Sequence, residues 1–526
     1  MEIVDPFMII MIIGSVSILF YMLYKISRFA FGLNTLLVFG MLAGVAHLNP
    51  IVQGILFLAC PLLSINTVLY VFLHKTDIAV PINDRYQVSF KTTKGSLKIN
   101  NIKRGVSIIG SAGSGKTESV VYGFLQHFQR HGFCGVIHDY KDFEITEMAY
   151  PLFKDCDIPF KVISFDKIIH RVNPIAPQYL ENPESVNEVS RVLIENLLEQ
   201  KDSVSIGATK FFHDAAEGLI GGLIWRLKAS YPEYCTLPHV IAIYHYLDTE
   251  SLITFLESNI ISKGMADAFI SGMDSDRQTA GVKGTLSNAL KRISTPRIFM
   301  ALSADEVPLN INQKDNPAVI SVVNNPRFET SYSPIIATII HTITKQMSVR
   351  HSKPSFLLME EAPTIKLLNM HRIPATLRSY DITTIYVMQD KIQNDMMYGD
   401  KASRAILSNL SYQFFGKVND PDTAKYYERF FEIIKHPTKS VSRGHSLDFD
   451  TRVTTGEKEI PKNRADVFFR LEQGEFITYA DGKDNKVQFI LQDIQRELPK
   501  PSKQFSKSDL EANFKRIYAE AKSIFE

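Results

Sequence analysis

The sequence predicts an α/β fold: a parallel sheet covered on both faces by helices, interrupted by an all-α insertion and preceded by transmembrane helices. Three observations lead to this prediction. Residues 1–75 contain long charge-free tracts, short apolar runs then alternate with amphipathic helices, and residues 182–309 show helical periodicity throughout. A chain of 526 residues is long enough for two or three domains beyond a membrane anchor.

The charge and the cysteines narrow the classes of function. The net charge is only +2, so the chain has no global basic surface, and a surface that binds nucleic acid must be local, such as the lining of a pore. The four cysteines are scattered without C-x-x-C spacing. They indicate neither a disulfide framework nor a zinc site, which fits a reducing cytosol.

The N-terminal residues 1–75 predict a membrane anchor. Residues 6–24 carry no charge and are long enough to span a bilayer, and residues 29–73 form a second charge-free tract of about twice one spanning length. Basic residues follow the first and the last tract, so the positive-inside rule gives three spans with the N-terminus outside. Two spans with a re-entrant or interfacial piece is the alternative. The acidic start argues against a cleaved signal peptide.

Seven short, apolar runs alternate with amphipathic helices in the rest of the chain. Near-continuous apolar strands of this kind belong to parallel sheets that helices cover on both faces. A ligand of such a sheet binds outside the carboxyl ends of the strands. The predicted strands lie within residues 105–110, 134–139, 160–165, 316–323, 355–360, 382–389 and 412–418.

A phosphate-binding loop follows the first of these strands. Residues 110–117 read GSAGSGKT and fill every position of G-x-x-x-x-G-K-[ST], between an apolar strand and an amphipathic helix. Small residues let backbone N–H groups surround phosphate oxygens, and the helix N-terminus adds positive potential. Lys116 would reach the β- and γ-phosphates, and the Thr117 hydroxyl would ligate Mg²⁺. The predicted nucleotide-binding residues are Gly110, Ser111, Ala112, Gly113, Ser114, Gly115, Lys116, Thr117 and Glu118.

Nucleotide hydrolysis also needs acidic groups at the end of a neighbouring strand. The apolar run PSFLLM is followed by Glu360 and Glu361, so one carboxylate would act on Mg²⁺ and the other on the attacking water. The next predicted strand ends with Gln389, whose amide would sense the γ-phosphate or position that water. For each of these residues the alternative is a solvated polar side chain at a strand end.

Two further charged segments have two interpretations each. Arg378 would stabilise transition-state charge in the site of a neighbouring subunit, or it would form a surface or interface salt bridge. Asp139 and Lys141 follow the second predicted strand. Lys141 either pairs with Asp139, the preferred interpretation, or approaches the nucleotide.

The all-α insertion, residues 182–309, divides the sheet domain into residues 76–181 and 310–495. Its first helix is expected to start at Asn182, which can cap it and is followed by a proline. Residues 435–464 lack periodicity and predict a loop with a hairpin.

The final segment, residues 496–526, predicts an amphipathic helix. Ser508 and Glu511 have the spacing of a capping box, and the apolar residues that follow form a single seam. The helix either packs against its own domain or docks on another protein.

Several segments have counterparts, in the same order, in one known family. GSAGSGKTES resembles its phosphate loop, VIHDYKDFEIT its D-x-K-G-E segment and RVNP its N-P turn. FLLMEEAPTI and IPATLRSYDITTIYVMQ resemble its L-L-D-E-F…R-x-Y-G-I…Q-S block, and AILSNLSYQFFGKVNDPDTAKYY its N-x…D-x-x-T-A segment. The family is that of the type IV coupling proteins, the TraD/TraG-type membrane ATPases of conjugation and type IV secretion, and the resemblance covers most of the chain.

The resemblance implies a RecA-like P-loop NTPase, usually a homo-hexamer, in the bacterial inner membrane with most of the chain in the cytoplasm. It implies ATP and Mg²⁺ as cofactors and type IV secretion channel components as partners. The implied cargo is a relaxase with single-stranded DNA, or effector proteins with their adaptors. By position, Thr117 and Glu360 take the metal-side roles. The residues that align with catalytic positions of the family are Lys116, Glu361, Arg378 and Gln389.

The chain departs from the family pattern at a few positions. Glu360 replaces an aspartate, which sets its carboxylate one methylene further out and could slow hydrolysis without abolishing binding. Asp142 and Asp381 stand where the family usually has glycine. The anchor leaves no room for a periplasmic domain of any size, so contacts of the family on that side do not carry over.

Three functions fit these observations. The first is an ATPase that couples recruitment of DNA or protein cargo to a type IV secretion channel. The second is a substrate receptor in which ATP only orders the ring. The third, a membrane-tethered DNA pump of the FtsK/HerA type, is disfavoured by the all-α insertion. The insertion also lacks the basic–aromatic ladder that single-strand binders use.

Overall fold

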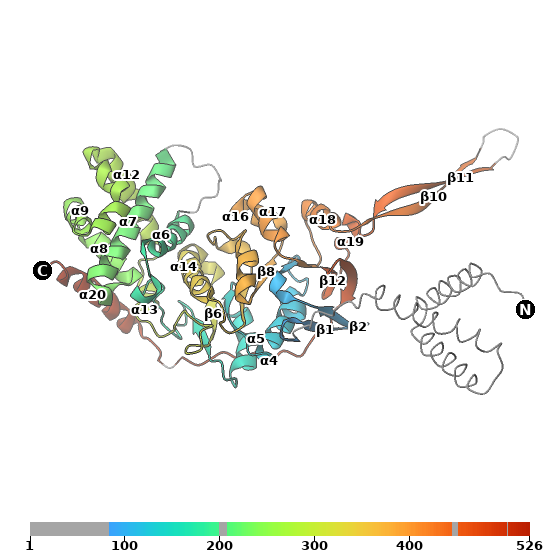
Figure 1. Ribbon diagram of the computed structural model, residues 1–526, viewed down its shortest axis with the longest axis horizontal. Helices are drawn as coiled ribbons and strands as arrows, with labels where there is room; N and C mark the ends of the chain where they lie inside the picture. The colour runs from blue at the N-terminus through green and yellow to red at the C-terminus, as the bar shows by residue number, and fades with distance from the viewer. Residues whose placement is uncertain (1–83, 199–207, 444–450, 502) are drawn as a thin grey trace, which may run out of the picture. The chain divides into compact units, whose positions relative to one another are not determined.

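A computed structural model describes residues 84–198, 208–443, 451–501 and 503–526 (Figure 1). The predicted membrane spans lie outside these residues. Within the described residues, no helix is both long enough and apolar enough to cross a membrane.

A nine-stranded sheet forms the centre of the described chain, with the strand order β13-β12-β9-β3-β8-β7-β4-β6-β5. The seven strands from β9 to β5 pair in parallel, and all seven were predicted from the sequence. The predicted α/β class with a large parallel sheet is therefore confirmed. These strands are β3 (Val106–Ile109), β4 (Cys134–Asp139), β5 (Phe160–Ile163), β6 (Val319–Val323), β7 (Ser355–Met359), β8 (Ile382–Met388) and β9 (Tyr412–Phe415).

Two antiparallel strands, which the sequence prediction missed, extend the sheet beyond β9. They are β12 (Glu475–Ala480) and β13 (Lys483–Gln488). The two-residue turn between them consists of Asp481 and Gly482, both with positive φ (50° and 76°). An Asp-Gly turn of this kind matches the twist of a tight hairpin. The sheet is thus mixed at this end.

Alternate side chains of the parallel strands enter two separate cores, one on each face of the sheet. Ile108 and Leu358 belong to one core, and their neighbours Ile109 and Met359 belong to the other. This alternation explains why apolar residues point to both faces of these strands.

Helices cover both faces. Helices α4 (Tyr122–Arg130) and α5 (Glu144–Phe153) contribute to the core that contains Ile108, together with the small hairpin of β1 (Val88–Thr92) and β2 (Gly95–Ile99). Helix α14 contributes to the other core. The helices that accompany the strands after β6 are α14 (Glu329–Met347), α15 (Ile373–Leu377), α16 (Lys391–Tyr398), α17 (Asp400–Ser408), α18 (Pro421–Glu428) and α19 (Ala465–Phe468).

Between β5 and β6 the described chain forms helices and no strand. Asn182 caps the first of them as predicted, since its side-chain oxygen accepts a hydrogen bond from the Ser185 amide at 2.9 Å. Helix α6 packs against α7 and against α14 of the sheet region. The helices are α6 (Pro183–Leu197), α7 (Ala208–Ser230), α8 (Leu237–Tyr246), α9 (Thr249–Glu257), α10 (Ile260–Met265), α11 (Asp267–Ile270), α12 (Asp276–Lys291) and α13 (Pro296–Ala301).

The C-terminal part runs from the sheet region to these helices. Residues 489–501 and 503–506, here called the C-terminal strap, follow β13 without regular structure. Helix α20 (Lys507–Ser523) then packs on α8 and α13 (Figure 1). It packs within its own chain, the first of the two predicted alternatives. Its capping box is formed by Ser506 and Asp509, not by Ser508 and Glu511, because the helix begins two residues earlier than expected.

The predicted hairpin within residues 435–464 is confirmed. Strands β10 (Ile433–Arg443) and β11 (Thr451–Pro461) pair in antiparallel register as a separate two-stranded ribbon (Figure 1).

Candidate functional site

Three neighbouring parallel strands end at one edge of the sheet and bring most of the predicted site residues together. Strand β8 pairs with β3 on one side and with β7 on the other. The phosphate loop follows β3, Gln389 follows β8, and Glu360 and Glu361 follow β7. Because the strands are parallel, all these residues leave the sheet at its carboxyl edge, where ligands of such sheets bind.

Glycines allow the phosphate loop to curl tightly beneath a covering turn. Gly113 and Gly115 have φ of 76° and 84°, which side chains rarely adopt. A Cβ on Gly115 would lie 2.9 Å from the amide nitrogen of Gly474, whereas a Cβ on Gly113 would meet no atom within 4 Å. The Gly474 amide donates a hydrogen bond to the Ser114 carbonyl at 2.9 Å. The turn before β12 therefore closes over the loop.

The loop leaves donors free that suit a phosphate group. In the described chain, the amides of Ala112, Gly113 and Gly115 donate to no backbone carbonyl, and the Thr117 hydroxyl has no partner. The buried hydroxyl of Ser114 is likewise unpaired. Free amides at the start of a helix are the usual ligands of phosphate oxygens, so these residues fit a nucleotide.

Lys116 is turned onto its own loop. It begins a π-helical turn, η3 (Lys116–Val121), and its side chain is buried. The Nζ donates to the carbonyl oxygens of Gly110 and, at 3.2 Å, of Ser111. Burial lowers the pKa of Lys116 to about 8, although the Glu361 carboxylate partly opposes this shift. To bind a phosphate, Lys116 would exchange these carbonyls for phosphate oxygens.

Glu360 and Glu361 are both buried and bonded, so a solvated role is wrong for this pair. The Glu361 backbone is left-handed (φ 43°), and its Oε1 accepts a hydrogen bond from Gln389 Nε2 at 2.9 Å. Glu360 accepts hydrogen bonds from the Tyr140 amide at 3.2 Å and from Lys141 Nζ at 3.1 Å. Glu361 thus bonds to the residue after β8 and Glu360 to residues after β4.

The predicted pair of Lys141 with Asp139 is wrong. Lys141 Nζ lies 3.1 Å from Glu360, 3.2 Å from Glu361 and 3.7 Å from Glu144. Asp139 is fully buried, and its Oδ2 accepts hydrogen bonds from the Thr146 amide (2.7 Å) and hydroxyl (2.5 Å).

The physical reason lies in the turn that follows β4. Asp142 and Phe143 both have positive φ, so the chain reverses after Lys141 and brings α5 over Asp139. Burial raises the pKa of Asp139 to about 6, although the hydrogen bonds from Thr146 act to lower it. Burial and the neighbouring Asp139 also raise the pKa of Glu360, which Lys141 opposes. Lys141 is therefore the cation that compensates the acidic pair.

Arg378 lies away from these residues. It is exposed in the short helix η9 (Arg378–Tyr380), just before β8 begins. The carbonyl of Asp381 accepts a hydrogen bond from the amide of Ser355 at the start of β7, which places this segment at the amino edge. A seven-residue strand separates the two edges by roughly 20 Å. Arg378 therefore does not reach the phosphate loop of its own chain, and it has no ion-pair partner in the described chain.

The two aspartates that replace glycines occupy positions that need positive φ. Asp142 has φ 48° and Asp381 has φ 60°. Aspartate tolerates this conformation better than most residues because its short side chain can bond locally. At both positions the backbone of this chain thus has a conformation that glycine also adopts readily.

A cavity of about 490 Å³ opens beside the phosphate loop. Ser111, Ala112 and Gly113 line one side, and Lys417, Asn419 and residues 469–473 line the other. The sequence analysis did not predict this second side of the cavity. The one sequence pattern that indicated the hairpin beside it was the Asp-Gly turn between β12 and β13. Glu118, one of the predicted nucleotide-binding residues, pairs with Arg496 of the C-terminal strap at 3.3 Å.

The described residues include no group of three or more His, Cys, Asp or Glu side chains that could hold a metal ion. A phosphate-bound Mg²⁺ does not need one, because it keeps several waters and takes only one or two carboxylates besides phosphate oxygens. Thr117 and Glu360 are chemically suitable for this role, although Glu360 is bonded to Lys141 here.

Solved structures share this fold. The bacterial conjugative coupling protein TrwB (TrwBdeltaN70, unbound form) aligns with a TM-score of 0.61 and 12% identity, covering 79% of this chain and 90% of that one. TrwB in complex with ADP and Mg²⁺ aligns with a TM-score of 0.58 and 12% identity, and the alignment covers 74% of this chain and 86% of that one. TrwB with a non-hydrolysable ATP analogue aligns with a TM-score of 0.56 and 12% identity, and the alignment covers 76% of this chain and 87% of that one. At this identity the likeness establishes the fold, an α/β domain with a large, mostly parallel sheet.

No curated protein is similar enough to match the chain. A protein family, however, matches residues 75–464, which span the phosphate loop, the helical region and the acidic pair. Its description is type IV secretory system conjugative DNA transfer. This match confirms the resemblance found in the sequence motifs. The chain belongs to the type IV secretory system conjugative DNA transfer family, that of the coupling proteins.

Proposed function

We propose that this protein is an ATPase, anchored in the bacterial inner membrane by residues 1–75 and assembled as a homo-hexamer. It couples recruitment of a relaxase–DNA complex or an effector protein to a type IV secretion channel. Residues 76–181 and 310–495 form the nucleotide-binding domain, residues 182–309 the all-α insertion, and residues 496–526 the C-terminal strap and helix.

One observation carries the proposal. The phosphate loop, Gln389 and the acidic pair leave adjacent strands at one edge, with Gln389 Nε2 2.9 Å from Glu361 Oε1. This is the arrangement that hydrolysis of a phosphate-loop-bound nucleotide needs. The TrwB structures with ADP and Mg²⁺ or an ATP analogue support ATP as the ligand.

The residues take the following roles. Lys116 and the loop amides hold the phosphates, and Thr117 with Glu360 holds Mg²⁺, which supplies charge neutralisation when bound. Glu361 accepts a proton from the attacking water, and Gln389 keeps the Glu361 carboxylate in position. Arg378 acts on the nucleotide of a neighbouring copy, because its own is out of reach.

Phosphate release by the full chain in mild detergent, with Mg²⁺ and ATP, tests the proposal. Lys116→Ala should lose both nucleotide binding and turnover, whereas Glu361→Gln should bind ATP and lose turnover by about a hundredfold or more. Glu457→Gln, an exposed glutamate of the β10–β11 ribbon, is the matched control and should behave as wild type. An active Glu361→Gln variant would contradict the assignment of the base.

The receptor hypothesis has a specific observation in its favour: Glu360 is longer than the family's aspartate and is held by Lys141. Tight nucleotide binding without turnover, with or without single-stranded DNA, would establish it. Glu360→Asp distinguishes the two functions, because it should raise turnover only if the extra methylene limits the ATPase.

A further inference from the structure

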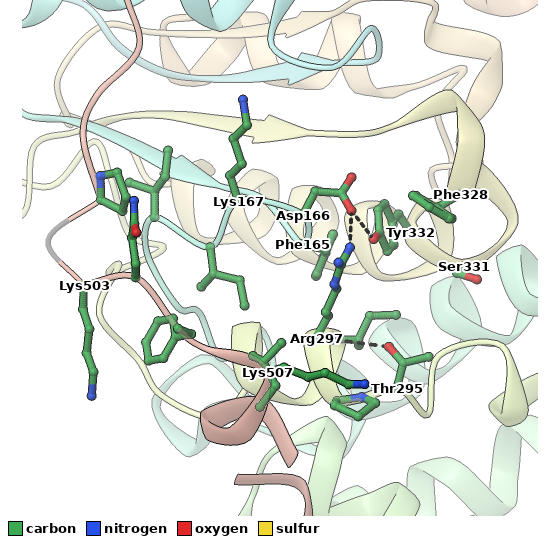
Figure 2. Close-up of a pocket in the computed structure, with 18 of the residues that line it drawn as sticks. Phe165, Asp166, Lys167, Thr295, Arg297, Phe328, Ser331, Tyr332, Lys503 and Lys507 are labelled. Atoms are coloured by element: carbon green, nitrogen blue, oxygen red, sulfur yellow. Dashed lines mark hydrogen bonds and ion pairs between the residues drawn. The ribbon is translucent and has the colours of Figure 1, made fainter. Parts of the chain in front are cut away.

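A groove of about 880 Å³ lies between four parts of the chain that are distant in sequence (Figure 2). One wall is the loop after β5, residues 165–169, and another is the start of α13 with Thr295. The third wall is the start of α14 with the preceding Phe328, and the fourth is formed by the C-terminal strap and the start of α20. The volume lies in the range of ordinary ligand sites. The groove shares no lining residue with the phosphate loop.

The interior of the groove is mainly apolar, and Asp166, the acidic residue within it, already has partners, whereas the second acidic lining residue, Glu511, is exposed at the rim. Asp166 Oδ1 lies 3.1 Å from Arg297 Nη1 and accepts a hydrogen bond from the Tyr332 hydroxyl at 2.9 Å (Figure 2). Asn325 Nδ2 donates to its Oδ2 at 2.8 Å. The remaining lining is mainly aliphatic, proline and aromatic, and the exposed ring of Phe328 stands at the edge.

The rim carries lysines that lack a close acidic partner. Lys507 is 91% exposed and reaches Glu511 only at 4.0 Å. Lys167 and Lys503 form no ion pair within 4 Å in the described residues, and each lies over an aromatic ring. Figure 2 shows these two side chains extending away from the groove in opposite directions. Among the described lining residues, the exposed lysines Lys167, Lys503 and Lys507 outnumber the one exposed carboxylate, Glu511, so the surface around the groove has a positive potential.

This combination defines the ligand chemistry. An apolar interior accommodates an aliphatic or aromatic anchor, and the lysines attract carboxylates beside that anchor. A nucleic-acid strand would need stacking platforms along the groove, but Phe328 is the single exposed ring of its lining in the described chain. We propose that this groove binds an acidic, amphipathic peptide segment of a partner protein, with an apolar side chain inserted beneath the C-terminal strap.

Fluorescence anisotropy with the full chain in mild detergent tests the proposal. The probe is a labelled peptide in which a Leu-Phe pair is flanked on both sides by aspartates. It should bind at least about tenfold more tightly than the same peptide with lysines in place of the aspartates. Replacing the Leu-Phe pair by two serines should also weaken binding, since the anchor is lost. Equal binding of these peptides would overturn the proposal.

Variants locate the site. Lys507→Glu should weaken binding of the acidic peptide by about tenfold, and Phe328→Ala severalfold. Lys515→Glu, an exposed lysine of the same helix that does not line the groove, is the matched control and should bind as wild type. A loss in Lys515→Glu equal to that in Lys507→Glu would mean non-specific attraction and overturn the proposal.

Two further measurements separate this groove from other sites. Displacement of the peptide by oligothymidylate, with affinity lost in Lys507→Glu, would assign the groove to nucleic acid and overturn the proposal. Lys116→Ala should bind the peptide normally, so that a failure of the nucleotide site and a failure of this groove remain distinguishable.

Discussion

Replacing Lys116 by methionine should remove nucleotide binding without weakening the folded protein. The side chain is 6% exposed, and its pKa lies at about 8 instead of 10.5. Because one unit of pKa is worth about 1.4 kcal/mol, burying this charge costs the fold on the order of 3 kcal/mol at neutral pH. Methionine keeps the length and removes the charge. It forfeits hydrogen bonds to two carbonyls, at about 1 kcal/mol each.

The nucleotide-free variant should therefore be as stable as wild type or more stable by about 1 kcal/mol. Wild type should gain about 2.7 kcal/mol from ATP and Mg²⁺ at a hundred times Kd, and the variant should gain nothing. Thermal unfolding of the full chain with and without nucleotide measures both effects. Lys483→Met, an exposed lysine of β13, is the control.

The pH dependence gives an independent check. Below pH 8 Lys116 is protonated in both the folded and the unfolded chain, so the free-energy cost of burying its charge is fully present. Between about 8 and 10.5 the unfolded chain binds more protons, so the free energy of unfolding of wild type rises relative to the variant. A variant less stable than wild type by more than about 2 kcal/mol, or one that nucleotide still stabilises, would refute this reasoning.

Three other predictions can be tested on the same protein. Arg378→Ala and Glu361→Gln subunits, each inactive alone, should partly restore ATP hydrolysis in mixed assemblies, because one supplies the glutamate and the other the arginine across an interface; mixtures with no more activity than the separate variants would remove Arg378 from the site. Gly115→Ala should destabilise the protein by about 2–4 kcal/mol in urea unfolding, because the new Cβ combines a positive φ with a contact of 2.9 Å to Gly474. Gly113→Ala, which has a positive φ but no such contact, should destabilise it by only about 1 kcal/mol. Equal destabilisation by the two variants would contradict the role of the covering turn. Ile517 is a fully buried residue of α20, so Ile517→Ala should lower the free energy of unfolding by about 2–4 kcal/mol and speed hydrogen exchange within residues 507–523. Unchanged exchange would show that the helix is not docked in solution.

Much of the fold could be predicted because its signals are local. The seven parallel strands are mainly apolar because both faces of the sheet are buried, and the phosphate loop is a contiguous motif. The cap at Asn182 follows from its own side chain and the next proline. By contrast, β13 is a polar, largely exposed strand, so apolar periodicity does not reveal the β12–β13 hairpin that it forms with the partly apolar β12.

The contacts of the site were harder to predict because they depend on turns. Lys141 is two residues from Asp139, which suggested a pair, but positive φ at Asp142 sends the chain away and leaves Lys141 to the two glutamates. The placement of Gly474 over Ser114 joins segments more than three hundred residues apart, and no local pattern encodes it.

The position of α20 has a consequence for biosynthesis. The helices between β5 and β6 are translated long before residues 507–523, yet α20 packs on α8 and α13 and buries Ile517 and Ala521 there. Until residues 507–523 have left the ribosome, the corresponding apolar surface stays open to water and to chaperones. The helical region thus reaches its final form only after a segment made more than two hundred residues later has emerged.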